Sequence, residues 1–264
     1  MQVFLYVGKM RDRYIILVLL FLFSSSLYAE QLKLAVASNF KQTLKQLAAD
    51  FEPRTGHELI ISSASSGKLY SQIINGAPYD VFFSADEKFA DQLVVEGLAV
   101  QESRYIYALG KLVLVSNTEL KAGCEEILRS SKLRRLAIAN PKTAPYGQAA
   151  KQVLEKLDLW QDLMPRLARG ENVSQAFQFV ATKNADAGLV ARAMLETSLS
   201  RSHGRLEFAC AWDVPEDMYL KIRQKLVVLK RSRPVEAAVD EFIDYMQSDA
   251  ARAIIRSSGY GSLY

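Results

Sequence analysis

From Leu32 onward, short apolar runs typical of β-strands alternate with stretches that place apolar residues at helical spacing. Residues 32–37, 57–62 and 79–84 are strand-like, whereas residues 40–51, 68–75 and 86–96 have the helical period. Proline and glycine in residues 53–56 and 76–78 end the first two of these helices. Repeated strand–helix units with such short links predict parallel sheets covered by helices.

The rest of the chain continues this alternation without a low-complexity linker. A chain of 264 residues is long enough for two compact units, so we expect two lobes joined by strands that cross between them. Residues 111–116 and 225–229 are the candidates for the crossing strands, and a double crossing of this kind forms a hinge. The predicted fold class is α/β, with a mixed, mainly parallel sheet flanked by helices in each lobe. Residues 30–110 together with 228–264 form the first lobe, and residues 111–227 form the second.

The first 29 residues have the organisation of a signal peptide. Arg11 and Arg13 precede an apolar run over residues 14–23, and the small residue Ala29 follows at a plausible cleavage point. A membrane anchor is the alternative, but this run is about half of the ~20 residues that span a bilayer. We therefore expect residues 1–29 to be removed on export, with Met10 as an alternative start.

Charge and composition argue against several classes of function. Removal of residues 1–29 leaves 30 basic and 28 acidic residues, and no basic, aromatic-rich stripe indicates nucleic acid binding. The histidines, His57 and His203, belong to no cluster, so we expect no transition metal held directly by side chains. Cys124 and Cys210 predict one disulfide in an oxidising compartment, and the alternative is two unlinked buried thiols.

Four predicted strand-to-helix junctions carry small or helix-capping residues: 37–39, 65–67, 144–147 and 171–174. Ligands of open α/β sheets bind beyond the carboxyl ends of the strands, where such junctions lie. A helix start offers main-chain N–H groups without helical partners and a partial positive charge. Two junctions from each lobe therefore predict one anion site between the lobes. The alternative is that each serine or asparagine only caps its helix.

The residue types at these junctions indicate which anion fits. Lys68 is the one basic residue beside them, so main-chain N–H groups, hydroxyls and an amide would hold the ligand. Such groups mainly donate hydrogen bonds, which favours a fully ionised tetrahedral oxyanion over a protonated phosphate that must itself donate.

Several stretches resemble the periplasmic molybdate-binding proteins of ABC importers, and the resemblance covers nearly all of the mature chain. Its most specific parts are Gly-Ala-Pro-Tyr-Asp at residues 76–80 and Phe-Phe-Ser-Ala-Asp at residues 82–86. The other matching stretches are residues 34–40, 63–68, 139–147, 170–173 and 257–261. The resemblance implies the two-lobed fold of type II periplasmic binding proteins, with the ligand in the cleft.

The resemblance also implies roles for individual residues. Ser38 and Ser66 match two serines whose hydroxyl and main-chain N–H groups hold the oxyanion, and Asn39 beside Ser38 is a further candidate donor. Tyr146 and Val173 match positions that each give a main-chain N–H group.

Two candidate contacts are less direct. Ser65 either contacts the ligand or only shapes the turn before the helix. Some family members have a ligand-contacting tyrosine after a Gly-Leu-Val run, but here residues 188–190 are followed by Ala191. The Tyr146 hydroxyl is the candidate replacement for that missing donor.

The function implied is capture of molybdate, and of tungstate, in the periplasm and delivery to an inner-membrane ABC permease. We expect a monomer that needs no cofactor and is not an enzyme, with molybdenum bound only as molybdate. A receptor for another oxyanion such as sulfate is the alternative within the same class. An exported hydrolase is the alternative from another class, but the junction serines have no histidine nearby, and acidic residues occur there only as caps.

Overall fold

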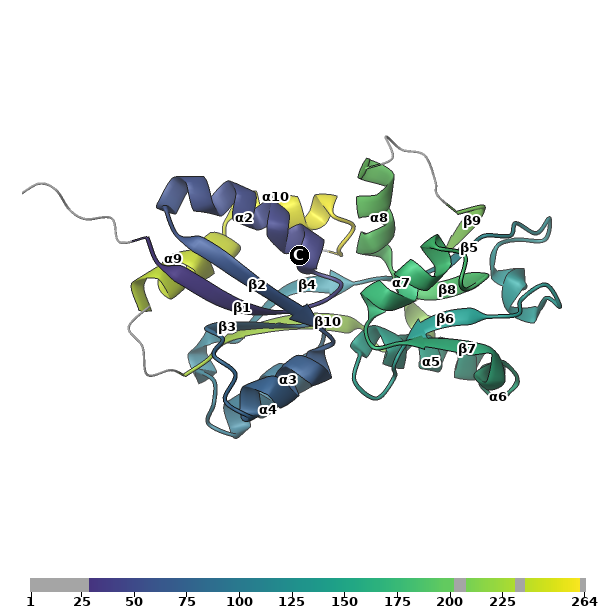
Figure 1. Ribbon diagram of the computed structural model, residues 1–264, viewed down its shortest axis with the longest axis horizontal. Coiled ribbons are helices and arrows are strands. Elements are labelled where there is room, and N and C mark those ends of the chain that lie inside the picture. Colours follow the sequence, from purple (N-terminus) through teal and green to yellow (C-terminus); the bar gives the residue numbers. More distant parts are fainter. Residues whose placement is uncertain (1–28, 202–207, 231–235, 262–264) are drawn as a thin grey trace, which may run out of the picture.

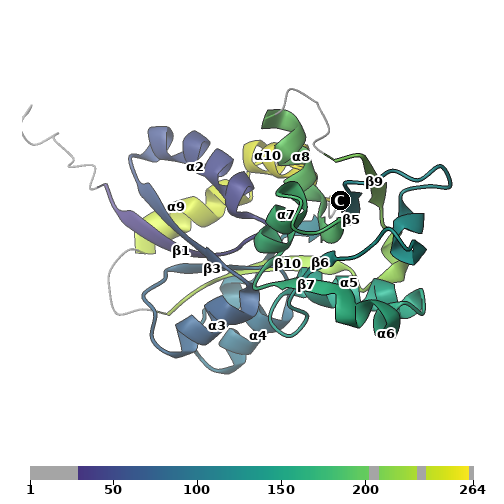
Figure 2. The same ribbon diagram turned by 45° about the vertical axis from the view of Figure 1, so that its right-hand side comes forward.

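The computed structural model describes residues 29–201, 208–230 and 236–261, so residues 1–28 of the expected signal peptide lie outside the described residues. The described chain forms two five-stranded sheets, each with its own helices, and the two lobes lie side by side (Figure 1). The view turned by 45° shows the same separation into two lobes (Figure 2). The expected two-lobed α/β fold is confirmed.

The first lobe contains a sheet with the strand order β2-β1-β3-β10-β4. Its strands are β1 (Gln31–Ala37), β2 (Glu58–Ala64), β3 (Val81–Ser84), β4 (Tyr105–Gly110) and β10 (Ile222–Val228). β1 pairs in parallel with β2 and β3, whereas β10 pairs antiparallel with β3 and β4. Its helices are α2 (Lys41–Thr55), α3 (Ser66–Ile74), α4 (Lys88–Val95), α9 (Glu236–Met246) and α10 (Asp249–Ser257).

Alternation along the strands explains how these helices cover both faces of the sheet. In β1, Leu34 and Val36 pack into a cluster with Phe40 and Phe242, on the side of α2, α9 and α10. Ala35, between them, points to the other face and packs with Leu69 in a cluster formed by α3 and α4. Figure 1 shows the two helical layers on opposite sides of the sheet. Both faces are buried, as expected for strands that read as continuous apolar runs.

The second lobe repeats this plan with the strand order β7-β6-β8-β5-β9. Its strands are β5 (Leu112–Ser116), β6 (Leu136–Ala139), β7 (Leu167–Gly170), β8 (Ala187–Ala191) and β9 (Cys210–Asp213). β6 pairs in parallel with β7 and β8, and β5 pairs antiparallel with β8 and β9. Its helices are α5 (Pro145–Lys156), α6 (Trp160–Leu163), α7 (Val173–Ala181) and α8 (Arg192–Arg201). Short 3₁₀ segments lie at Gln101–Ser103, Glu125–Arg129, Met164–Arg166 and Glu216–Met218.

The chain crosses between the lobes twice, and one expected boundary differs from the structure. The first crossing is the single residue Lys111, between β4 and β5. The second lies between β9 and β10, because β10 pairs with β3 and β4 in the first sheet. Residues 222–227, which we expected in the second lobe, therefore belong to the first sheet. The sheet that a strand joins depends on its distant pairing partners, so residues 222–227 carry no local signal for it.

Three helices or strands of the second lobe were not expected from the sequence, the four-residue helix α6 among them. β7 has only four residues, Leu-Ala-Arg-Gly, and shows no clear alternation. α8 lacks a single apolar stripe because it packs against both lobes: Ala193 joins the core of the first lobe and Leu195 joins that of the second. β9 lies at Cys210–Asp213, and residues 202–207 before it lie outside the described part of the chain.

The expected disulfide is confirmed and lies within the second lobe. Cys124 and Cys210 are bonded, with their Cα atoms 5.8 Å apart. The bond ties the segment after β5 to the start of β9. Among the described residues, no helix has the length and apolar character needed to cross a bilayer.

Candidate functional site

The four junctions of the sequence analysis lie where the two lobes meet. Ser38 and Asn39 follow β1, and Ser65 and Ser66 follow β2. In the second lobe, residues 140–144 lead from β6 to the start of α5, and residues 171–172 lead from β7 to α7. β1 and β2 are parallel, as are β6 and β7, so each pair of junctions lies at one edge of its sheet.

Three contacts join these junctions across the lobes. The main-chain N–H of Gly67 donates to the carbonyl oxygen of Thr143 at 2.9 Å. The Ser174 hydroxyl donates to the carbonyl oxygen of Ser38 at 3.1 Å. Lys68 Nζ and Glu171 Oε2 form an ion pair at 3.3 Å. The structure is therefore closed over the junctions.

The candidate site residues are buried although most of them are polar. They are Ser38 (8% exposed), Asn39 (4%), Ser65 (4%), Ser66 (0%), Tyr146 (1%) and Val173 (3%). Burial of polar groups is costly unless they are hydrogen-bonded, so the partners of each group show what is left for a ligand.

Five main-chain donors in these residues, that of Ser65 among them, have no acceptor in the described part of the chain. No acceptor is found there for the N–H groups of Asn39, Ser65, Ser66, Tyr146 and Val173. The last three lie in the first turn of α3, α5 and α7, where helical N–H groups have no helical acceptor. The first lobe thus contributes three main-chain donors and the second lobe two.

Ser38 and Ser66 differ in which of their hydrogen-bond donors remain free for a ligand. The Ser66 hydroxyl accepts a hydrogen bond from the main-chain N–H of Ala85 at 2.9 Å, which leaves its own proton free to donate. The main-chain N–H of Ser38 donates to the carbonyl oxygen of Ala64 at 2.9 Å. Ser38 can therefore offer its hydroxyl only, in contrast to the expectation that both groups contribute. Ser65 directly precedes α3, and its hydroxyl makes no capping hydrogen bond there.

The side-chain amide of Asn39 donates both of its protons within the first lobe. Its Nδ2 donates to Gln224 Oε1 at 2.7 Å and to Tyr260 Oη at 3.1 Å, which uses both amide protons. Tyr260 Oη in turn donates to the main-chain oxygen of Asn39 at 2.9 Å. Asn39 can thus offer its main-chain N–H rather than its side chain.

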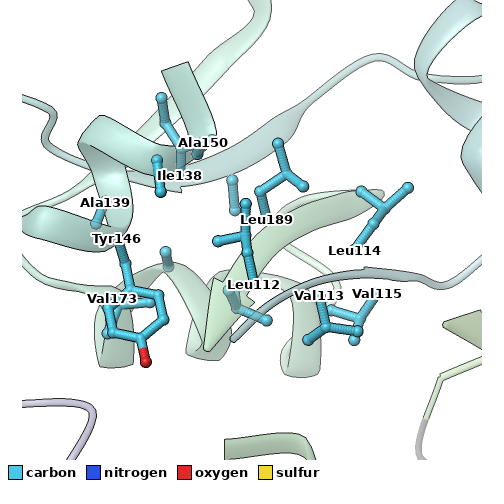
Figure 3. Close-up of a cluster of buried hydrophobic side chains, with 14 of the residues drawn as sticks. Leu112, Val113, Leu114, Val115, Ile138, Ala139, Tyr146, Ala150, Val173 and Leu189 are labelled. Carbon is cyan, nitrogen blue, oxygen red and sulfur yellow. The ribbon is translucent and has the colours of Figure 1, made fainter. Parts of the chain in front are cut away.

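The Tyr146 hydroxyl lies at the hinge. Figure 3 shows it at the margin of the buried cluster of the second lobe, directed away from the aliphatic side chains. It accepts a hydrogen bond from Gln224 Nε2 at 3.3 Å and lies against Gly110, the last residue of β4. Ala191, where the family tyrosine is missing, is fully buried at the end of β8. The structure therefore gives the Tyr146 hydroxyl a donor on β10, while its own proton and the main-chain N–H of Tyr146 have no acceptor in the described part of the chain.

The buried donors are electrically neutral. Burial raises the pKa of Tyr146 and of Tyr107 well above the usual value, so both phenols keep their protons. Lys68 beside the site is paired with Glu171, and both side chains are more than half exposed. The arrangement can hold an anion through dipoles and hydroxyls in a site sheltered from water, where charge-assisted hydrogen bonds are strong.

Asp80 and Asp86, which flank β3, have structural partners. Asp86 Oδ1 accepts hydrogen bonds from the Phe89 main-chain N–H and the Ser84 hydroxyl, which orders the start of α4. Burial raises the pKa of the Asp86 carboxyl. Asp80 Oδ2 accepts from the main-chain N–H of Lys33 at 2.6 Å and fastens β3 to β1. Asp80 and Asp86 therefore hold a strand and a helix start in place.

A match to a family model covers most of the chain. Residues 32–261 match the family described as bacterial extracellular solute-binding protein. The chain belongs to this family. Members of the family are solute-binding components of transport rather than enzymes, which confirms the expectation that the chain is not an enzyme.

Individual members of the family are similar over nearly their whole length. The molybdate-binding protein ModA of Azotobacter vinelandii is 42% identical over 237 residues, which cover 88% of this chain and 90% of that protein. ModA of Rhodobacter capsulatus is 40% identical over 226 residues, covering 86% of each chain. The solved structure of the Azotobacter vinelandii periplasmic molybdate-binding protein superposes with a TM-score of 0.81 at 39% identity, covering 88% of this chain and all of that one. The resemblance found in the sequence is therefore confirmed.

Proposed function

We propose that this protein captures molybdate between its two lobes. The observation that carries the proposal is the set of five partnerless main-chain donors, three from the first lobe and two from the second, on Asn39, Ser65, Ser66, Tyr146 and Val173. The hydroxyls of Ser38 and Ser66 add two more donors. Each charge-assisted hydrogen bond contributes about 1.5–3 kcal/mol, so roughly six of them can offset the desolvation of a dianion.

The choice of molybdate has two supports. The donors are uncharged and no carboxylate lies among the buried candidate residues, so an anion without protons fits better than one that must donate. The relatives at 40–42% identity are named for molybdate. Tungstate has the same charge and shape, and we propose that it binds to the same groups.

Titration calorimetry with molybdate, tungstate, sulfate and phosphate tests the ligand. We expect tight binding of molybdate and tungstate and much weaker binding of sulfate and phosphate. Preferential binding of sulfate would show that sulfate rather than molybdate is the ligand, and the proposed anion site would still hold. Binding of none of the four anions would contradict the proposed function.

The Ser38→Ala/Ser66→Ala variant tests the site itself. Loss of two charge-assisted hydrogen bonds should weaken molybdate binding by at least about 100-fold. Because Ser66 also accepts the N–H of Ala85, the variant needs a control for stability. Ser248→Ala is matched, since the Ser248 hydroxyl also accepts a main-chain N–H, that of Ala251, far from the cleft. The control should lose stability and keep its affinity.

Export and delivery are part of the same proposal. We propose that residues 1–29 direct the chain to the periplasm, where the protein acts as a monomer and transfers its anion to an inner-membrane ABC permease. Amino-terminal sequencing of protein from the periplasmic fraction should begin at Glu30. A chain that retains its first residues in the membrane fraction would contradict cleavage.

A further inference from the structure

Gln224 makes hydrogen bonds to both lobes from the interior of the hinge. It lies in β10 and is fully buried. Its Oε1 accepts from Asn39 Nδ2 at 2.7 Å and from Tyr107 Oη at 3.0 Å, both in the first lobe. Its Nε2 donates to Tyr146 Oη at 3.3 Å, in the second lobe. This one side chain thus connects a candidate ligand residue of each lobe.

The backbone around Gln224 is shaped for this contact. The pairing of β10 with β4 shifts register between Gln224 and Lys225, and a bulge of this kind redirects side chains. At Gly110, an added Cβ would clash with Tyr146 Oη and lie 2.9 Å from Gln224 Nε2. The glycine therefore leaves room for the tyrosine hydroxyl to reach the amide.

Asn39 and Tyr146 each have a side chain that is hydrogen-bonded to Gln224 and a main-chain N–H group without an acceptor in the described chain. The side chain of Asn39 bonds to Gln224, while its N–H has no acceptor in the described chain. Tyr146 likewise bonds to Gln224 through its hydroxyl, and its N–H lacks an acceptor there. Whatever fixes these side chains relative to each other also fixes the separation of the two main-chain donors.

We propose that Gln224 is a positioning residue that sets the separation of the lobes in the closed form, and with it the affinity and size selectivity for oxyanions. This inference rests on the proposed function. Hydrogen bonds tolerate a distance range of only a few tenths of an ångström before they weaken. Molybdate is larger than sulfate because its metal–oxygen bonds are longer, so a fixed separation discriminates between them.

Tyr146→Phe is the most direct test, because it removes only the hydroxyl and keeps the main-chain N–H. The dissociation constant for molybdate should rise about 3- to 10-fold, the value of one net hydrogen bond. The increase should appear in the dissociation rate, because the contact holds the closed form. The ratio of the dissociation constant for sulfate to that for molybdate should decrease. The melting temperature without ligand should stay the same, because separated lobes do not make the contact.

Gln224→Met provides a second test, since it keeps a similar volume and removes all three hydrogen bonds. If both residues act through one contact, Tyr146→Phe should raise the dissociation constant for molybdate less in the Gln224→Met background than in wild type. Tyr245→Phe is the matched control. The Tyr245 hydroxyl bonds to Leu47 and Asp50 within the first lobe, so this variant should lose stability and keep its affinity and selectivity.

The results separate this inference from the proposed function. Wild-type protein that binds no molybdate overturns both. Wild-type binding together with unchanged affinity, dissociation rate and selectivity in Tyr146→Phe overturns the role of Gln224 alone. A lower melting temperature without ligand at unchanged selectivity also overturns it, because the hydroxyl then only stabilises the fold.

Discussion

The main-chain N–H of Gly67 donates a hydrogen bond of 2.9 Å to the carbonyl oxygen of Thr143, in the opposite lobe. A Cβ atom on Gly67 would lie 3.0 Å from that oxygen and 3.1 Å from the Thr143 Cα. Such contacts are tighter than ordinary van der Waals distances. The absence of a side chain at Gly67 therefore lets the two lobes approach this closely.

Gly67→Ala should hinder closure without harming the open protein. The methyl group meets backbone of the other lobe, so we expect the dissociation constant for molybdate to rise about tenfold. Within its own lobe the added Cβ would lie 3.0 Å from the end of the Phe89 ring, which must shift. Alanine is the better helix former at the start of α3, so the melting temperature without ligand should change little. Calorimetric titration and differential scanning calorimetry measure both quantities. An unchanged affinity would show that the lobes accommodate the methyl group.

Lys68→Gln should have little effect on binding. The lysine side chain is 54% exposed and already paired with Glu171, and exposed ion pairs contribute about 0–1 kcal/mol. We expect the molybdate dissociation constant to change by less than about threefold at physiological salt. A loss of tenfold or more that disappears in high salt would mean that the site depends on a cation after all.

Removal of the disulfide should lower stability and leave binding intact. Cys124 and Cys210 are 86 positions apart, for which the chain-entropy model gives about 4–5 kcal/mol at 25 °C. The Cys124→Ala/Cys210→Ala variant leaves no free thiol, since the described chain has no other cysteine. Urea unfolding should show this loss in free energy of unfolding. A large change in molybdate affinity would indicate that the bond also shapes the cleft.

Binding should be insensitive to pH across the neutral range. Burial raises the pKa of Tyr146 and Tyr107 well above 10.0, whereas an unfolded tyrosine ionises near that value. Their contribution to stability is therefore complete below about pH 10 and is lost as the pH rises above it. Titrations between about pH 7 and about pH 9 should give one molybdate affinity. A midpoint near neutral pH would require a titrating group in the site.

Much of the fold follows from local patterns. β8, Ala-Gly-Leu-Val-Ala, is a continuous run of apolar residues and glycine, and Ser248 is a cap residue directly before α10. α8 was missed because its apolar residues face two different cores. The assignment of residues 222–227 was wrong because sheet membership depends on pairing with strands more than a hundred positions away.

Sequence reasoning likewise found some residues of the candidate site and missed others. Helix starts are encoded locally, so Ser66, Tyr146 and Val173 could be placed at junctions from the sequence alone. Gln224 could not be found, because its partners Asn39 and Tyr107 are 185 and 117 positions away. The strand sequence Ile-Arg-Gln-Lys-Leu-Val-Val does not single out Gln224, whereas its complete burial does.

The position of β10 in the first sheet has a consequence for how the chain folds during synthesis. β10 separates β3 from β4 in the first sheet, yet it is the last strand that a ribosome delivers. The second sheet uses one uninterrupted piece of chain, Leu112–Asp213, and can assemble as soon as that piece has emerged. The lobe that is translated first is therefore completed last, against the usual order of amino-terminal folding. A nascent chain stopped before Ile222 would contain a finished second lobe and a first sheet still in two parts.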